Sequence, residues 1–316
     1  MTAGNLLPRV SCCLGGLFEA GKDGTGEISS TADGKISFIE RGDKTLCGLT
    51  GYGGQIAVYP LEKATFIPQA EYAVTDLDGT SILSEDFWIY VIEQTVRKLT
   101  GKNVSFTAED VPFVSGHTTA DHLDYALKKY GAGEYAGVTE TYYEISRREL
   151  ASLSSGGDYS KIRPADGLKE FLTGLKSRGV KLALVSSGLF YKAIPEIESA
   201  FKAMGMGDPR EFYDEIIMGG VEKGGKQYST LGELCAKPHP WLYKEVAVAG
   251  LKCKNREKLI VVEDSASGVL SARLAGYSVI GLTSGNIDAS GMSDLCSFRA
   301  ESLKDAYKII IGEKGK

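Results

Sequence analysis

The feature that most restricts the fold of this chain is an alternation of short apolar segments with helical segments between residues 162 and 282. Apolar runs with the length of strands lie at Val180–Val185, Leu259–Val262 and Ser278–Leu282, after a similar run at Tyr72–Val74. Strands that are apolar on both faces are typical of a parallel sheet covered by helices on both sides. We therefore predict an α/β core of Rossmann-like type, with a doubly wound parallel sheet.

Polar residues follow three of the predicted strands at the point where each strand ends. In an open parallel sheet the carboxyl ends of the strands meet at one edge, and binding sites form along it. We therefore expect the three polar groups to lie close together although they are far apart in the sequence. These groups are Asp76 with Asp78, Ser186–Gly188, and Glu263–Ser265.

The segment Asp76–Thr80 contains two carboxylates one residue apart, followed by a glycine and a hydroxyl. Residues i and i+2 of an extended segment point to the same side, and Gly79 lets the chain turn away after them. Two adjacent carboxylates repel each other unless a cation or a proton lies between them, and Mg²⁺ prefers oxygen ligands. The alternative is an acidic turn, because Asp-Gly pairs are also typical of turns.

Each of the other polar motifs has an ordinary explanation when it is considered alone. Ser186–Gly188 is a common strand-to-helix turn with a serine that can cap a helix. Lys237, which precedes two prolines, could be a solvated loop residue, and Glu263–Ser265 could stabilise the start of the next helix. These separate explanations do not account for the order in which the motifs occur along the chain.

In that order, the motifs resemble those of the haloacid-dehalogenase-like hydrolases. The residues that carry the resemblance are Asp76–Thr80, Ser186–Gly188, Lys237-Pro238-x-Pro240, Glu263–Val269 and Ala272–Gly276. They are most similar to the branch that includes β-phosphoglucomutase and many sugar-phosphate phosphatases, in which a helical cap lies between the first two motifs. The resemblance covers about residues 70–285 and implies a core at 71–83 and 162–316 with a helical cap at 84–161.

The resemblance implies a Mg²⁺-dependent phosphatase that hydrolyses a small phosphorylated metabolite through an aspartyl-phosphate. Asp76 would be the nucleophile and Asp78 the general acid and base, while Ser186 and Lys237 would stabilise the transferring phosphate. The implied metal ligands are Asp76, the backbone carbonyl of Asp78, Asp264 and, through water, Glu263. The backbone N–H groups implied to bind phosphate are those of Leu77, Ser187 and Gly188.

Departures from the patterns of related enzymes bear on the choice of reaction. Asp78 favours phosphate esters over haloacids, because a halide leaves without a proton. P-type ATPases have a lysine where this chain has Leu77, and they also have membrane helices. In β-phosphoglucomutase-like proteins an arginine and a histidine stand at the positions of Thr119 and Trp88. Hydrolysis is therefore preferred, and a phosphomutase of the β-phosphoglucomutase type is the alternative.

The helical segment between the first two motifs is expected to act as a lid over the active site. Ser84 is placed to cap its first helix, which Gly101 would end. The candidate substrate-facing residues of this cap are Trp88, His117 and Thr118.

Residues 1–70 are rich in glycine and contain three short β-like runs, Lys35–Glu40, Thr45–Leu49 and Gln55–Tyr59. We predict a small β-rich N-terminal extension whose role the sequence does not indicate. It could be an interaction module, in which case the hydrolase part would be a regulated domain. Deleting residues 1–68 and assaying solubility and turnover would separate these possibilities.

The composition restricts the kinds of partner. A net charge of −5 without a basic run excludes a nucleic-acid-binding surface of the usual kind. The start of the chain is a poor signal peptide, and no run approaches the ~18 apolar residues of a membrane span. The six cysteines show no CxxC spacing, which is consistent with a reducing cytosol. We expect a cytoplasmic enzyme that binds neither membrane nor nucleic acid; its oligomeric state is left open.

Overall fold

The computed structural model describes residues 6–51, 54–107, 109–110, 119–131, 133–155, 161–219, 222–223, 226–227 and 236–313. The chain forms two compact units. The first contains Met1–Ser81, Asp166–Phe190 and Arg210–Lys316, and the second contains Ile82–Ala165 and Tyr191–Pro209. Within the described ranges, no helix combines the length and hydropathy needed to cross a membrane.

The first unit is built on a six-stranded sheet in which every neighbouring pair is parallel. In spatial order its strands are β11 (Glu215–Gly219), β10 (Lys181–Leu189), β7 (Tyr72–Asp76), β14 (Leu259–Glu263), β15 (Ser278–Leu282) and β16 (Phe298–Ala300). All five residues of β7, β14 and β15 are buried, as expected for strands covered on both faces. The predicted Rossmann-like α/β core is confirmed.

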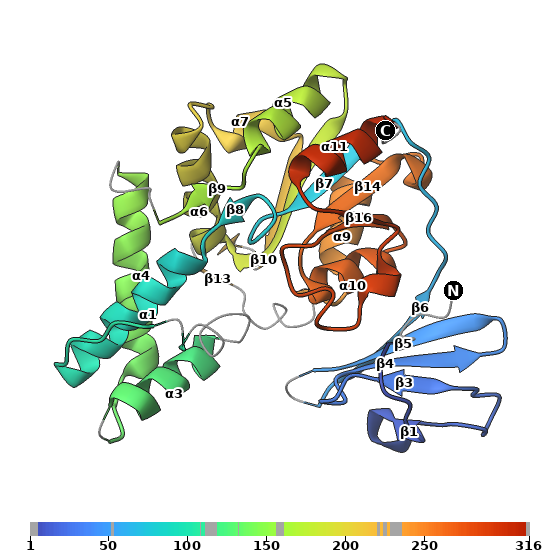
Figure 1. Ribbon diagram of the computed structural model, residues 1–316, viewed down its shortest axis with the longest axis horizontal. Helices are drawn as coiled ribbons and strands as arrows, with labels where there is room; N and C mark the ends of the chain where they lie inside the picture. Colours follow the sequence, from blue (N-terminus) through green and yellow to red (C-terminus); the bar gives the residue numbers. More distant parts are fainter. Residues whose placement is uncertain are drawn as a thin grey trace. The chain divides into compact units, whose positions relative to one another are not determined.

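Helices cover this sheet because alternate strand residues point to opposite faces. Val74, Val185 and Val261 belong to the same hydrophobic cluster as Leu242 and Val269, which lie on α9 and α10. Helices α5 and α11 contact each other, and they contact β10 and β16, respectively (Figure 1). The helical segments of this unit are α5 (Leu168–Ser177), α7 (Pro209–Phe212), α9 (Trp241–Glu245), η2 (Val246–Gly250), η3 (Arg256–Lys258), α10 (Ala266–Leu274), η4 (Ser293–Leu295) and α11 (Leu303–Ile311).

The N-terminal extension belongs to the first unit and forms an antiparallel sheet in the order β3-β4-β5-β6 (Figure 1, blue). Phe38, Cys47 and Leu49 of this sheet lie in one hydrophobic cluster with Leu242 and Tyr243 of α9. The predicted β-rich extension is confirmed, and it shares a hydrophobic core with the parallel sheet. Its elements are β1 (Cys12–Cys13), η1 (Leu14–Gly16), β2 (Phe18–Glu19), β3 (Ile28–Ser30), β4 (Ile36–Arg41), β5 (Lys44–Thr50) and β6 (Ile56–Leu61).

The second unit is mainly helical. It contains β8 (Ile82–Leu83), α1 (Glu85–Thr100), α3 (Thr119–Tyr130), α4 (Val138–Ser154), β9 (Arg163–Pro164) and most of α6 (Phe190–Ala203). Residues Tyr191–Pro209 belong to this unit, whereas the predicted core at 162–316 includes them. Their packing explains the difference, since Trp88 Nε1 on α1 donates a hydrogen bond to Glu196 of α6 at 2.7 Å. The Lys192 ammonium also lies 3.7 Å from the centre of the Trp88 ring.

The ends of α1 test the predicted helix boundaries. The helix begins directly after Ser84, but the Ser84 side chain makes no capping hydrogen bond, so that part of the prediction is wrong. Glu85 and Asp86 in the first turn have charges that favour a helix start. Gly101 ends the helix as predicted, in the left-handed conformation with φ of 68°.

Candidate active site

The register of the parallel sheet brings the three polar groups to one edge. Val185 of β10 pairs with Asp76 of β7, and Val262 of β14 pairs with Thr75. Ser186 and Glu263 follow these paired residues directly and therefore lie at the same edge as Asp76. Strand order and register thus explain why residues separated by more than a hundred positions in sequence can meet.

Lys237 joins two of the carboxylates at this edge. Its Nζ atom donates hydrogen bonds to Oδ1 of Asp76 and, at 2.6 Å, to Oε1 of Glu263. The side chains of Lys237, Asp76 and Glu263 are only 5%, 8% and 0% exposed. Burial alone would lower the pKa of Lys237, but the two carboxylates raise it above its usual value. Lys237 is therefore a permanent cation within the cluster.

Glu263 is surrounded by donors from the protein itself. Besides Lys237, the hydroxyl of Tyr243 donates a hydrogen bond to Oε1, and the Ser265 hydroxyl donates to Oε2 at 3.1 Å. A Cβ atom at Gly268 would lie 1.9 Å from Oε1, so only a glycine leaves room for this carboxylate. The contact of Tyr243 with Glu263 joins α9 to β14, and no local sequence pattern predicts such a contact between distant segments.

Asp264 points to the same cluster and is held from the first motif. The hydroxyl of Thr80 donates a hydrogen bond to Oδ1 of Asp264 at 2.8 Å. Gly79 has φ of +81°, and a Cβ atom there would lie 2.2 Å from Oδ2 of Asp264. Gly79 therefore serves both the turn and the close approach of Asp264. The sequence shows a hydroxyl at Thr80 in the motif but does not predict which group it contacts.

Three carboxylates in this cluster could hold a cation. Asp76, Glu263 and Asp264 each offer an oxygen within 4.8 Å of the others. Burial, followed by repulsion from Glu263, raises the pKa of Asp76 well above its usual value and that of Asp264 to about 7. One lysine does not balance three acids, so a hard divalent cation fits the chemistry of these oxygens.

The Ser186–Gly188 segment is connected to the lysine loop. The Ser186 hydroxyl, which is buried, accepts a hydrogen bond from the backbone N–H of Gly188 at 2.8 Å. The Ser187 hydroxyl accepts one from the backbone N–H of Lys237 at 3.0 Å. The hydrogen bond from Lys237 to Ser187 holds the carboxyl end of β10 next to the segment before α9.

The other candidate residues are not among the three grouped carboxylates. Asp78 is exposed. Among the described residues, its carboxylate is not part of the group formed by Asp76, Glu263 and Asp264. Leu77 is fully buried. Trp88 lies in the second unit, where it contacts Glu196 and Lys192. His117 and Thr118 lie outside the described residues.

Comparisons with known proteins identify the fold and the family of this chain. The family model for haloacid dehalogenase-like hydrolases matches residues 73–282. A candidate β-phosphoglucomutase from Thermotoga maritima is 20% identical, with a TM-score of 0.55, over 76% of this chain and 96% of its own. A predicted phosphoglycolate phosphatase from Haemophilus somnus is 19% identical, with a TM-score of 0.56, over 77% of this chain and 99% of its own.

A third similar structure is that of CbbY from Rhodobacter sphaeroides in complex with phosphate. It is 17% identical, with a TM-score of 0.53, over 74% of this chain and 95% of its own. At these identities the structures establish the fold, and the family model, which matches about two thirds of the chain, establishes the family. The chain belongs to the haloacid dehalogenase-like hydrolase family.

Proposed function

We propose that this protein is a Mg²⁺-dependent phosphatase that hydrolyses a small phosphorylated metabolite through an aspartyl-phosphate at Asp76. One observation carries the proposal: the buried carboxylate of Asp76 receives a hydrogen bond from Lys237 and lies next to Glu263 and Asp264. Such a carboxylate is oriented by a fixed cation and is adjacent to oxygens suited to a metal. Both features favour nucleophilic catalysis of phosphoryl transfer, because they orient the attacking oxygen and offset negative charge.

In the first step, an oxygen of Asp76 attacks phosphorus and the bond from phosphorus to the ester oxygen breaks. Asp78, which is exposed and lies two residues after the end of β7, gives its proton to the departing alkoxide. In the second step, Asp78 accepts a proton from water while the water oxygen attacks phosphorus, and the bond between phosphorus and the Asp76 oxygen breaks. Inorganic phosphate leaves, and both aspartates return to their starting states.

Positive charge must offset the negative charge of the transferring group. The ammonium group of Lys237 does this from one side, and the Ser186 hydroxyl with the N–H groups of Leu77, Ser187 and Gly188 is proposed to bind the phosphate oxygens. The carboxylates of Asp76 and Asp264 and the backbone carbonyl of Asp78 would hold Mg²⁺. The metal would supply further positive charge at the phosphoryl oxygens.

Glu263 is proposed to act mainly through Lys237. Its oxygens already accept hydrogen bonds from Lys237, Tyr243 and Ser265, so a contact with the metal would run through water. Residues 84–161 are proposed as the cap, to which the packing of α6 adds Tyr191–Pro209. Contacts of Trp88, His117 and Thr118 with the substrate stay predictions.

A panel of phosphorylated metabolites tests the proposal directly. The purified protein is incubated with each ester in Mg²⁺ or in EDTA, and both free phosphate and isomerised ester are measured. We expect Mg²⁺-dependent phosphate release that Asp76→Asn abolishes. Isomerisation without net phosphate release would support the phosphomutase alternative, and release that is unaffected by Asp76→Asn would refute the assigned nucleophile.

A further inference from the structure

The N-terminal sheet contacts the segment that carries Lys237. The hydroxyl of Tyr59, on β6, is hydrogen-bonded to Nδ1 of His239 at 2.8 Å. The two rings meet edge to face with their centres 5.8 Å apart, and the Trp241 ring approaches Tyr59 in the same manner at 6.2 Å. Tyr59 therefore touches this segment two and four residues after Lys237.

His239 is held from two directions. Its side chain is buried, with the residue only 7% exposed, and bonds Tyr59 of the N-terminal sheet. Its backbone carbonyl accepts a hydrogen bond from the Ser271 hydroxyl of α10 at 2.6 Å. The path from His239 to the catalytic cluster is short, because Lys237 Nζ contacts both Asp76 and Glu263.

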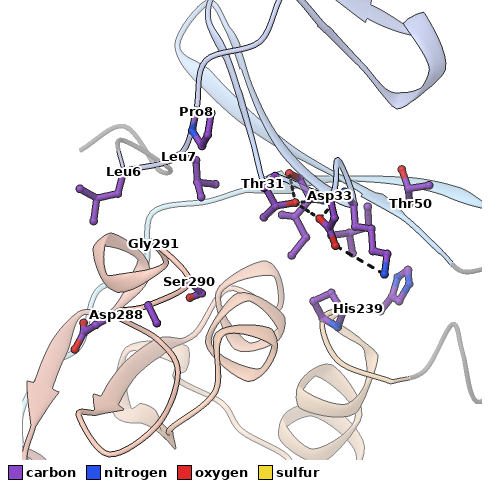
Figure 2. A pocket seen from close by; sticks show the side chains of 16 residues that line it. Leu6, Leu7, Pro8, Thr31, Asp33, Thr50, His239, Asp288, Ser290 and Gly291 are labelled. Atoms are coloured by element: carbon purple, nitrogen blue, oxygen red, sulfur yellow. Dashed lines mark hydrogen bonds and ion pairs between the residues drawn. The ribbon is translucent and has the colours of Figure 1, made fainter. Parts of the chain in front are cut away.

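A cavity beside His239 explains why the contact with Tyr59 matters. The cavity has a volume of about 780 Å³, and the residues that line it include Pro238 and His239 as well as Leu49 and Thr50 of β5. Figure 2 shows His239 at its wall, across from Thr31 and Asp33. Side chains that border a cavity have fewer packing contacts to restrain them. A hydrogen bond therefore has a larger share in fixing this segment.

We propose that Tyr59 is a positioning residue for the reaction, acting through His239 to keep Lys237 aligned with Asp76 and Glu263. This inference rests on the proposed function. It assigns the N-terminal sheet a part in turnover, although the match to the family begins only at residue 73. Tyr59 itself lies outside the catalytic cluster and is not proposed to touch the substrate.

The first test is Tyr59→Phe in the full-length protein. This variant removes the hydroxyl but keeps the aromatic ring that packs against His239 and Trp241. We expect kcat to fall about three- to tenfold, with KM changed less than about twofold and little change in melting temperature. The matched control is Tyr307→Phe on α11. It removes a hydroxyl that accepts a hydrogen bond from Arg178 at 2.9 Å, and it should leave kcat unchanged.

The second test asks whether Tyr59 acts through His239. If it does, Tyr59→Phe should have little further effect on kcat in a His239→Ala background, so the two changes are not additive. Nitrogen NMR of the histidine side chains gives a readout that does not depend on turnover. The chain has three histidines, so the His239→Ala spectrum identifies the His239 signals, and Tyr59→Phe should shift its Nδ1 resonance.

The outcomes separate this inference from the proposed function. If the wild-type protein releases phosphate and Asp76→Asn does not, the proposed function stands whatever Tyr59→Phe does. An unchanged kcat in Tyr59→Phe, an effect confined to KM, or additive effects with His239→Ala would then overturn only the positioning role. Absence of phosphate release from every ester by the wild-type protein would overturn the function, and the inference with it.

Discussion

The Nζ atom of Lys237 lies 2.6 Å from Oε1 of Glu263, and both side chains are nearly inaccessible to solvent. The same nitrogen contacts Asp76, so one buried cation is shared by two buried carboxylates. Charges removed from water are stable only when they are paired and fully hydrogen-bonded. The Lys237 ammonium therefore holds the Asp76 carboxylate in place. Removing any one of these three charged groups should lower the stability of the protein.

Lys237→Met should inactivate the protein and destabilise it. The substitution leaves Asp76 and Glu263 without their shared cation in a buried setting, which typically costs about 3–5 kcal/mol. We expect kcat to fall more than about a hundredfold and the free energy of unfolding to drop by that amount, as measured by urea denaturation. Lys308→Ala, which removes an ion pair with the partly exposed Asp305, should cost less than about 1 kcal/mol. Equal losses in both variants would contradict the role of burial.

Gly268→Ala should disturb Glu263 although it adds a single methyl group. The new Cβ would lie 1.9 Å from Oε1 of Glu263, so the carboxylate that holds Lys237 must move. We expect a loss of about 1–3 kcal/mol of stability and a clear fall in kcat. Gly207→Ala is the matched control, because a Cβ there meets nothing within 4 Å. Normal turnover by Gly268→Ala would show that the position of Glu263 is not critical.

Mg²⁺ activation should depend on pH through Asp264. Burial, followed by repulsion from Glu263, raises the pKa of Asp264 to about 7, so protons compete with the metal below that pH. We expect the Mg²⁺ concentration for half-maximal activity to rise by up to about tenfold for each pH unit below 7. The measurements are made at those pH values between 5 and 8 at which the protein is folded. A half-maximal Mg²⁺ concentration that stays constant over this range would contradict the prediction.

The same pKa shift predicts an effect on stability without Mg²⁺. Since the pKa of Asp264 is about 7 in the folded protein and 3.8 as its reference value, its stabilising contribution is present below about pH 4. That contribution is lost as the pH rises through 7. Asp264→Asn should therefore raise the melting temperature in EDTA at pH 8, while the exposed Asp294→Asn should not. A lower melting temperature for Asp264→Asn would contradict the raised pKa.

The central strands and their polar ends could be predicted from the sequence because each signal is local. β7, β10 and β14 are short apolar runs that end in a few polar residues, and parallel sheets place such ends together. The two elements at the end of the chain, β16 and α11, were not predicted. β16 has only three residues, Phe298–Ala300, with an arginine in the middle, which is too little to show a pattern.

Contacts between distant segments could not be predicted in the same way. The hydrogen bond from Tyr243 to Glu263 joins α9 to β14, and the one between Tyr59 and His239 joins β6 to the segment before α9. The local sequence around each of these tyrosines does not distinguish it from an ordinary aromatic residue of the core. The Trp88 contact with Glu196 likewise joins residues on two helices, and it accounts for the position of α6 in the second unit.

The most direct test of the account is to trap the phosphorylated enzyme and locate the phosphate. The protein is mixed with a substrate ester and Mg²⁺, quenched rapidly, and treated with borohydride, which reduces an acyl phosphate so that mass spectrometry can identify the residue. The account predicts modification at Asp76 only when ester and Mg²⁺ are both present. With an aryl phosphate, whose phenolate leaves without needing a proton, it predicts stronger modification in Asp78→Asn, in which water is not activated. Modification at another residue, or full turnover without any modification of Asp76, would contradict it.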